Sequence, residues 1–301
     1  MKKFTKIWLR ICLVLFLLSL GCFAGSIAMG TTMKEVGNVI GNNYYTISNE
    51  FRSFSGLKFR NSEWKEEWNQ ATKLKNTKTE LKTSKNLKIK LYGQMIIQQD
   101  KNCKQPNIEI DERMKNRVRI IDEETLTIVT KPVRDTGGKI ILNLPENYQF
   151  KGVDIELDSG NIQMDTLIMN IIQIEAEEGN IDISDAVKCY TANLMIDSGS
   201  IHAEKMECIK QLKAKVDVGN IEIKNMSSSD IDLRCDVGKI TAGLEEGFDL
   251  YNIALQCNTG NIKLGAETYS NMKKNITSSS GSDDARKLYV SCDVGSVEIN
   301  E

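Results

Sequence analysis

The sequence is poor in the residues on which several common functions depend. It contains one histidine, His202, and three prolines. A single histidine cannot supply a two-histidine metal site, and any histidine-dependent nucleophilic mechanism would have to use that one position. No two of the eight cysteines have the Cys-x-x-Cys spacing of a zinc site. Three prolines among 301 residues also exclude collagen-like and proline-rich linker architectures. We therefore expect no metal and no cofactor.

The rest of the composition is that of a globular chain of one or two domains, with 41% hydrophobic and 27% charged residues. Its charge is unevenly placed. Residues 1–150 carry 25 Lys/Arg and 15 Asp/Glu, whereas residues 151–301 carry 14 and 26, so the two halves face different neighbours. Seven lysines either form a solvated linker or face anionic lipid headgroups or wall polymer: Lys73, Lys75, Lys78, Lys82, Lys85, Lys88 and Lys90. No nucleic-acid partner is expected.

Residues 11–33 form an uncharged apolar stretch that follows four basic residues. As a helix it would reach about 34 Å, enough to cross a hydrocarbon core of about 30 Å. The positive-inside rule then places the N-terminus in the cytoplasm and everything after Lys34 outside. Two processed forms compete with this anchor: a lipoprotein at Cys22, within LSLGC, and a secreted protein cleaved near 26–28. All three place most of the protein outside the cytoplasm.

Seven related segments fill residues 151–301, and IELDSGNIQM (155–164) is the first. Each centres on one glycine: Gly160, Gly179, Gly199, Gly219, Gly238, Gly260 and Gly295. Successive glycines are 19, 20, 20, 19, 22 and 35 residues apart, so the last two intervals contain insertions. With each glycine as position zero, positions −7, −5, −3, +2 and +4 are apolar in every copy.

Apolar alternation with a period of two, interrupted by an acid-x-Gly step, predicts two short strands joined at a corner. Glycine would supply the positive φ of that corner. A unit this small cannot bury its own apolar face, so consecutive units should stack about 4.8 Å apart. The predicted fold is all-β: a parallel β-solenoid with turns of about 20 residues, preceded by the N-terminal transmembrane helix. Leucine-rich repeats have a similar period, but their Leu-x-x-Leu-x-Leu-x-x-Asn frame is absent.

These tandem units resemble the bacterial putative-adhesin family of β-strand repeats, a domain of unknown function. KIILNLP (139–145), VDIEL (153–157) and the closing CDVGSVEI (292–299) match the family's pattern as well. The resemblance covers roughly residues 87–301, and the basic start and single apolar segment are similar to membrane-anchored members from Gram-positive bacteria. It implies a parallel β-solenoid outside the cell with an adhesion or envelope-stress role. The family has no catalytic motif to transfer.

The region before the array is more degenerate. Residues 87–97 indicate an early turn, and residues 107–110, 118–121 and 126–129 indicate further strands of a cap. Either Trp64 and Trp68 lie at the membrane interface, or one of them is buried against this cap. The predicted organisation is therefore 1–33 cytoplasmic start and anchor, 34–84 polar Lys-rich extracytoplasmic stalk, 85–150 degenerate strands and cap, and 151–301 repeat array.

The position two before each glycine is acidic in six copies and asparagine in the seventh: Asp158, Glu177, Asp197, Asp217, Asp236, Asp293 and Asn258. We expect these side chains, with the glycines, to be structural turn residues that accept hydrogen bonds from the backbone of the corner. Stacked carboxylates could instead gather Ca²⁺. The Gly-Gly-x-Gly-x-Asp repeat of calcium-binding β-helices is absent.

His202 lies at the outward +3 position, where its neighbours on adjacent turns would be Asp182 and Glu222. A base between two acids suggests a β-helix enzyme that acts on acidic polysaccharides. The rest of the +3 row has no consistent chemistry, so a solvated face is the preferred interpretation and no enzyme is expected.

Three cysteines at the inward −3 position, Cys235, Cys257 and Cys292, indicate a vertical stack in the core, and Cys189 and Cys208 indicate a second one. A disulfide between adjacent turns of the first stack is conceivable, although an insertion separates Cys257 from Cys292. Cys103 lies in a loop and is the candidate for a reactive thiol. The polar insertion 266–286 is expected to project from the last turn, either as a passive excursion or as a place where a partner binds.

The preferred function is therefore a non-enzymatic, membrane-anchored extracytoplasmic β-solenoid that presents an interaction surface. Its partner would be a cell-envelope polymer or a membrane or surface protein. The alternatives are an envelope-stress sensory protein that acts through a membrane partner, and the β-helix enzyme on acidic polysaccharide.

Overall fold

A computed structural model describes residues 62–131, 138–270, 274–280 and 285–301. The predicted anchor 11–33, with Cys22 and the candidate cleavage site near 26–28, lies outside these residues. Within the described ranges, no helix is long and apolar enough to cross a membrane. The described residues form one α-helix, two short 3-10 helices (Glu112–Met114 and Phe248–Leu250) and otherwise mostly strands.

The elements follow one another in a simple order. The N-terminal part contains α3 (Ser62–Gln70), β1 (Thr72–Lys73), β2 (Lys78–Glu80), β3 (Asn86–Gln99), β4 (Asn107–Ile110), β5 (Val118–Asp122), β6 (Thr125–Thr130) and β7 (Lys139–Leu144). The array contains β8 (Gln149–Met164), β9 (Leu167–Ser227), β10 (Asp230–Leu244), β11 (Tyr251–Leu264), β12 (Glu267–Ser270), β13 (Lys274–Ser278) and β14 (Arg286–Asn300). The length of β9 shows that the chain stays extended through successive corners.

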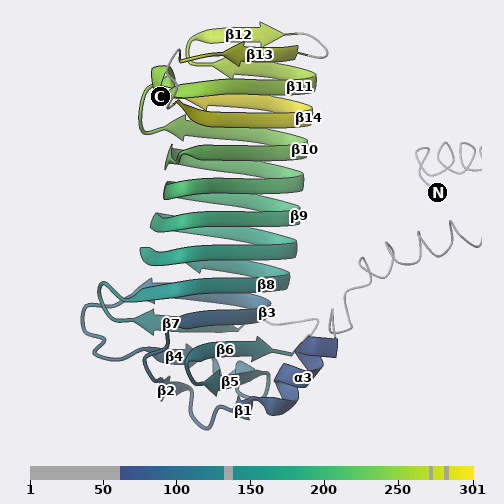
Figure 1. Cartoon of the computed structure of the whole chain (residues 1–301). Helices are drawn as coiled ribbons and strands as arrows, with labels where there is room; N and C mark the ends of the chain where they lie inside the picture. The colour runs from purple at the N-terminus through teal and green to yellow at the C-terminus, as the bar shows by residue number, and fades with distance from the viewer. Residues whose placement is uncertain (1–61, 132–137, 271–273, 281–284) are drawn as a thin grey trace, which may run out of the picture. The chain divides into compact units, whose positions relative to one another are not determined.

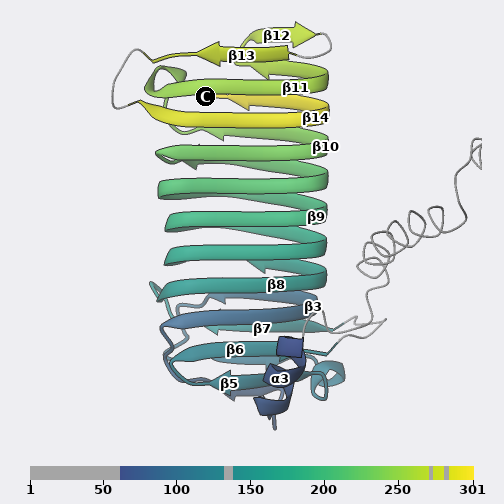
Figure 2. The same ribbon diagram turned by 45° about the vertical axis from the view of Figure 1, so that its right-hand side comes forward.

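The repeats stack in register as parallel rungs of a β-solenoid, which Figures 1 and 2 show from two sides. Gly179 of β9 pairs with Gly160 of β8, and Ile181 pairs with Ile162. The same equivalence holds higher in the array, where Gly238 of β10 pairs with Gly219 of β9. Residues at one repeat position therefore form columns that run across the rungs. The prediction of an all-β parallel solenoid is confirmed.

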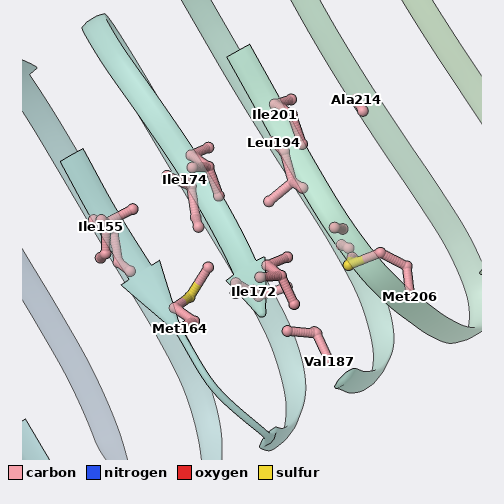
Figure 3. Packing of buried hydrophobic residues seen from close by; sticks show 14 of the residues in the cluster. Ile155, Met164, Ile172, Ile174, Val187, Leu194, Ile201, Met206 and Ala214 are labelled. Carbon is pink, nitrogen blue, oxygen red and sulfur yellow. The ribbon is translucent and has the colours of Figure 1, made fainter. Parts of the chain in front are cut away.

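The inward columns form one continuous hydrophobic core. Positions such as Ile155, Ile174 and Leu194 are fully buried or nearly so, and their side chains point between the strands (Figure 3). Met164, Ile172 and other aliphatic residues fill the adjoining space from the same rungs. Alternation with a period of two places every second side chain in this core, so the pattern that predicted the strands also accounts for their packing.

The rungs do not stack entirely in sequence order. The last strand, β14, lies between β10 and β11 and pairs with both in parallel, as Figure 1 shows for the yellow strand. The expectation that consecutive units stack on one another is therefore wrong at this end. The insertion that precedes β14 was expected to project, but its strands β12 and β13 instead pair antiparallel with β11. They use the outer edge of β11 and leave the inner edge for β14.

The cap at the other end begins with an imperfect rung. Leu87 of β3 pairs with Val153 of β8, and Gly93 pairs with Gly160. Strands β6 and β7 then pair in parallel with the two halves of β3. Strands β4 and β5 run antiparallel to β7 and β6, so the chain changes from parallel to antiparallel pairing as it closes the end of the solenoid.

Residues 62–84, the described part of the predicted stalk, do not form a separate polar segment. Trp64 of α3 is fully buried, and its indole lies edge-on to Tyr92 with ring centroids 4.9 Å apart. Its Nε1 donates a hydrogen bond of 2.5 Å to Glu156 of β8. Lys90, also fully buried, lies 3.1 Å from a carboxylate oxygen of Glu67 on the same helix. Aromatic burial and paired charge thus hold α3 against the first rungs.

The glycine corners allow a direct test of the stacking. Gly219 has φ of 143°, and a Cβ there would lie 1.6 Å from the carbonyl oxygen of Gly199 on the preceding rung. We expect Gly219→Ala to destabilise the protein by about 3 kcal/mol or more, because strained φ and a backbone clash act together. Urea unfolding followed by circular dichroism measures this change.

The matched control is Gly152→Ala. Gly152 also lies in a strand of the array, but the nearest atom to its added Cβ is the Oδ1 of Asn86 at 3.5 Å, an ordinary contact. This substitution should change the unfolding free energy by no more than about 0.5 kcal/mol. Equal effects at the two glycines would contradict the close stacking of the corners.

Candidate functional site

The outer surface at the glycine corners is the first candidate site, because the sequence places its acidic column there. In space the column runs Asp158, Glu177, Asp197, Asp217, Asp236, Asp293, Asn258, since β14 precedes β11. Asp158 is buried, whereas Asp197, Asp236 and Asp293 are exposed.

Members of this column pair with neighbouring side chains and with each other. Asp217 forms an ion pair of 2.6 Å with Lys215 on its own strand, and Asp293 accepts a 2.8 Å hydrogen bond from Asn258 on the next rung. The backbone hydrogen bonds expected for the column stay a prediction. Among the residues that the structure describes, no group of three Asp, Glu, His or Cys side chains is arranged to hold a metal ion.

Asparagine occupies position +1 in four of the seven copies, and the three that accept a hydrogen bond from the next rung, Asn161, Asn180 and Asn220, are here called the asparagine ladder. The Oδ1 of Asn161 accepts hydrogen bonds from the backbone N and the Nδ2 of Asn180, at 3.2 and 2.9 Å. The Oδ1 of Asn180 accepts from the backbone N of Ser200 at 3.0 Å, and Asn220 contacts Lys239 in the same way at 3.1 Å. The recurring Gly-Asn-Ile triplet was the signal. A side-chain amide at this position links its own corner to the next rung.

The single histidine lies on an outer face within a network of ion pairs. The Nδ1 of His202 lies 3.4 Å from Glu222, as the repeat register predicted, and its Nε2 lies 3.6 Å from Glu204. Glu204 also pairs with Lys224 at 2.5 Å, and this hydrogen bond lowers the pKa of the Glu204 carboxyl. A general acid needs a raised pKa, so Glu204 is unsuited to that role near neutral pH.

The cysteine columns are closer than the sequence indicated. Because β14 lies between β10 and β11, Cys292 pairs in register with both Cys235 and Cys257, and all three are buried. The supposed separation of Cys257 from Cys292 is therefore wrong. In the second stack, the Sγ atoms of Cys189 and Cys208 lie 3.2 Å apart in the core. All six described cysteines are free thiols, and the five in these two stacks are buried and act as small core residues.

Cys103 lies in the loop between β3 and β4, and its exposure is intermediate. Its Sγ lies 2.7 Å from the carbonyl oxygen of Gln105, and the Nδ2 of Asn107 lies 3.2 Å from the sulfur. The reactivity of this thiol stays a prediction.

Most of the lysine cluster is paired within the cap. Lys78 pairs with Glu109, Lys85 with Glu124, and both Lys88 and Lys90 with Glu67, while the Nζ of Lys82 donates to the carbonyl oxygen of Asp122. Lys73 and Lys75 are exposed and line a groove of about 500 Å³ between β1, β2 and β5. Because the same groove contains Asp122 and Glu123, it is not a strongly cationic surface.

The family of the chain follows from its repeats and their register. The family model of Toastrack DUF4097 matches residues 69–293, more than half of the sequence. The chain belongs to the Toastrack DUF4097 family. This confirms the family expected from the Gly-Asn-Ile repeats. No curated protein matches this Toastrack chain.

Solved structures similar to this Toastrack chain have low sequence identity. A "putative adhesin" from Bacteroides fragilis is 14% identical with a TM-score of 0.41, over 74% of this chain and 95% of that one. A "putative cell adhesion protein" from Clostridium sporogenes is 10% identical with a TM-score of 0.28, over 74% and 97%. A "putative lipid binding protein" from Parabacteroides distasonis is 14% identical with a TM-score of 0.35, over 74% and 94%.

Glu298 allows a test of the ion pairs on the outer face. It lies 2.8 Å from Lys263 and 3.1 Å from Lys239, on the two neighbouring rungs. Hydrogen bonds from Lys263 and Lys239 lower the pKa of Glu298 to about 2, from an ordinary 4.5. Because the folded-state pKa is depressed, the stabilisation is complete above about pH 4.5 and is lost as the pH falls towards 2.

We expect Glu298→Gln to lower the urea midpoint at pH 7 and to bring it closer to the wild-type midpoint at pH 3. Glu178→Gln, a change at an exposed carboxylate of the same array, is the control and should be nearly neutral at both pH values. A Glu298→Gln difference that is the same at pH 7 and pH 3 would contradict the role of the two lysines.

Proposed function

We propose that this Toastrack chain is a non-enzymatic, membrane-anchored module that presents the outer face of its solenoid to a partner in the cell envelope. The observation that supports this most directly is the organisation of the described domain. The side chains of the inward columns are buried in the core, while those of the outward columns are repeated at rung spacing over the whole array. Such a surface is suited to extended ligands, which contact many equivalent positions at once.

The anchor part of the proposal is supported by the sequence before the described domain. Residues 11–33 have the length and composition of a membrane-spanning helix, and four basic residues precede them. A single-pass protein of this orientation carries the solenoid outside the cytoplasm. A partner is then a wall polymer, a membrane protein or a molecule on another cell surface.

The site chemistry supports binding over catalysis. The residues around His202 form ion pairs on an open face, and the carboxyl closest to its Nε2 has a lowered pKa because of Lys224. A glycosidase needs one carboxyl that stays protonated near its working pH beside a second that is ionised. The lowered pKa of Glu204 is the opposite of what a carboxyl that stays protonated requires.

We predict that the full chain stays with the membrane after an alkaline carbonate wash and that protease added to intact cells degrades it. Cys22→Ser should leave this retention unchanged, because the anchor is the apolar helix rather than a lipid on that cysteine. Release of the Cys22→Ser variant from the membrane would contradict the helical anchor. Protection of the chain from external protease would contradict the orientation.

Binding is tested with the full chain in lipid nanodiscs and two probes, purified wall polymer and detergent-solubilised envelope proteins. We expect saturable binding to one of them. We expect this binding to be lost in Gly219→Val, whose β-branched side chain meets the strained φ and the backbone clash described for Gly219→Ala. Absence of binding to both probes would contradict the function as a binding module.

A direct assay addresses the enzymatic alternative. We expect the wild-type chain to release no reducing ends from acidic polysaccharides, and His202→Ala, Asp182→Ala and Glu222→Ala to leave this result unchanged. Reducing-end production by the wild type that falls by about 100-fold or more in these variants would overturn the non-enzymatic assignment.

A further inference from the structure

Three neighbouring rungs share a corner sequence that the others lack. Asp-Val-Gly occurs at 217–219, 236–238 and 293–295, whereas the other four repeats carry Asp-Ser-Gly, Glu-Glu-Gly or Asn-Thr-Gly. In sequence order these three copies are interrupted by the repeat of Gly260. The insertion of β14 between β10 and β11 makes them contiguous, since Val237 pairs in register with both Val218 and Val294.

The three valines form an exposed apolar column, here called the valine row. Val218, Val237 and Val294 are 54%, 47% and 48% exposed. The equivalent position is polar on the flanking rungs, with Ser198 below and Thr259 above. Single exposed apolar residues are ordinary, but a contiguous apolar group rimmed by polar residues is typical of an interaction surface.

Carboxylates border the valine row along one side. Asp217, Asp236 and Asp293 each precede one of the valines. Asp217 is paired with Lys215, whereas Asp236 and Asp293 are exposed. A second set of exposed apolar side chains, Ile171, Tyr190 and Ile209, has a different border, because the Nζ of Lys210 lies 6.0 Å from the centroid of the Tyr190 ring. The valine row is therefore suited to a partner with apolar and cationic groups side by side.

The distance between valines on adjacent rungs favours one conformation of that partner. Two rung intervals span about 9.6 Å, two turns of an α-helix advance about 10.8 Å, and two same-face steps of a β-strand advance about 13 Å. Apolar side chains one helical turn apart can therefore contact all three valines, whereas apolar side chains on one face of a strand no longer match the third valine. The apolar stripe of an amphipathic helix meets the valines, and Lys or Arg beside the stripe meets the aspartates.

We propose that the valine row and its bordering aspartates bind a basic amphipathic helix of a partner protein. This rests on the proposed binding function and names the class of partner. An anionic lipid surface is disfavoured, because Asp236 and Asp293 would face its headgroups. A second copy of the chain is disfavoured as well, because it would bring two carboxylate columns into one contact.

The test uses the full chain in nanodiscs of zwitterionic lipid and a fluorescein-labelled 18-residue peptide of Leu and Lys, with Leu at every third or fourth position. Fluorescence anisotropy, corrected with empty nanodiscs, should show saturable binding. The triple variant Val218→Ser, Val237→Ser, Val294→Ser should weaken it by at least about tenfold. Serine occupies this position in Ser159 and Ser198, so the fold is kept and the charge is unchanged.

Two further variants separate apolar contact from charge. The triple Ile171→Ser, Tyr190→Ser, Ile209→Ser removes three exposed apolar side chains elsewhere and should leave peptide affinity unchanged. The triple Asp217→Asn, Asp236→Asn, Asp293→Asn introduces the residue present at Asn258, and it should weaken binding and reduce its dependence on salt.

Equal affinity of the wild type and the valine-to-serine variant would overturn the proposal. An equal loss of peptide affinity in the control triple would overturn it too, as would equal binding of a peptide with Glu in place of Lys. A third contrary result is sedimentation that shows a dimer for the wild type and a monomer for the valine-to-serine variant. If the wild-type chain binds wall polymer or envelope proteins but does not bind the peptide, the helix site fails while the proposed function stands. If the wild-type chain binds neither the peptide nor either envelope probe, the helix site and the proposed function both fail.

Discussion

The structure depends on the close stacking of equivalent corners. Each repeat glycine lies against the carbonyl oxygen of the glycine on a neighbouring rung, so close that a Cβ at Gly219 or Gly260 would lie 1.6 Å from that oxygen. This approach keeps neighbouring rungs in register and lets parallel hydrogen bonding continue through the corner. The register of the corners also aligns the other columns of the solenoid, including the isoleucine column of the core and the asparagine ladder outside.

A stacked array of this kind leaves an open edge at each end, and each end is closed by antiparallel strands. At the N-terminal end β4 and β5 turn back on β7 and β6, and α3 packs on the side of the first rungs through Trp64. At the other end β12 and β13 cover β11. Exposed strand edges invite pairing with other chains, so closing both ends allows a long regular array to remain a discrete domain.

The repeat frame is sufficient to predict the array, because the relevant interactions are local and repeated. Positions such as Ile174 and Leu194 are apolar in every copy because alternate side chains of a strand face the core. This alternation can be recognised within a single rung. The same logic located the cysteine stacks and the contact between His202 and Glu222. The cap was harder to predict, because Trp64 and Lys90 are held by contacts between segments far apart in sequence, and the polar residues around them resembled a linker.

The sequence by itself determined the period, the inward and outward faces and the glycine corners, since these follow from strand geometry within about 20 residues. Only the tertiary structure decided the order of the last rungs. Each repeat presents nearly the same edge and the same apolar columns, so local energetics scarcely distinguish one neighbour from another. The pairing of β12 and β13 with one edge of β11 resolves this by leaving the other edge to β14, and it thereby brings Val237 beside Val294.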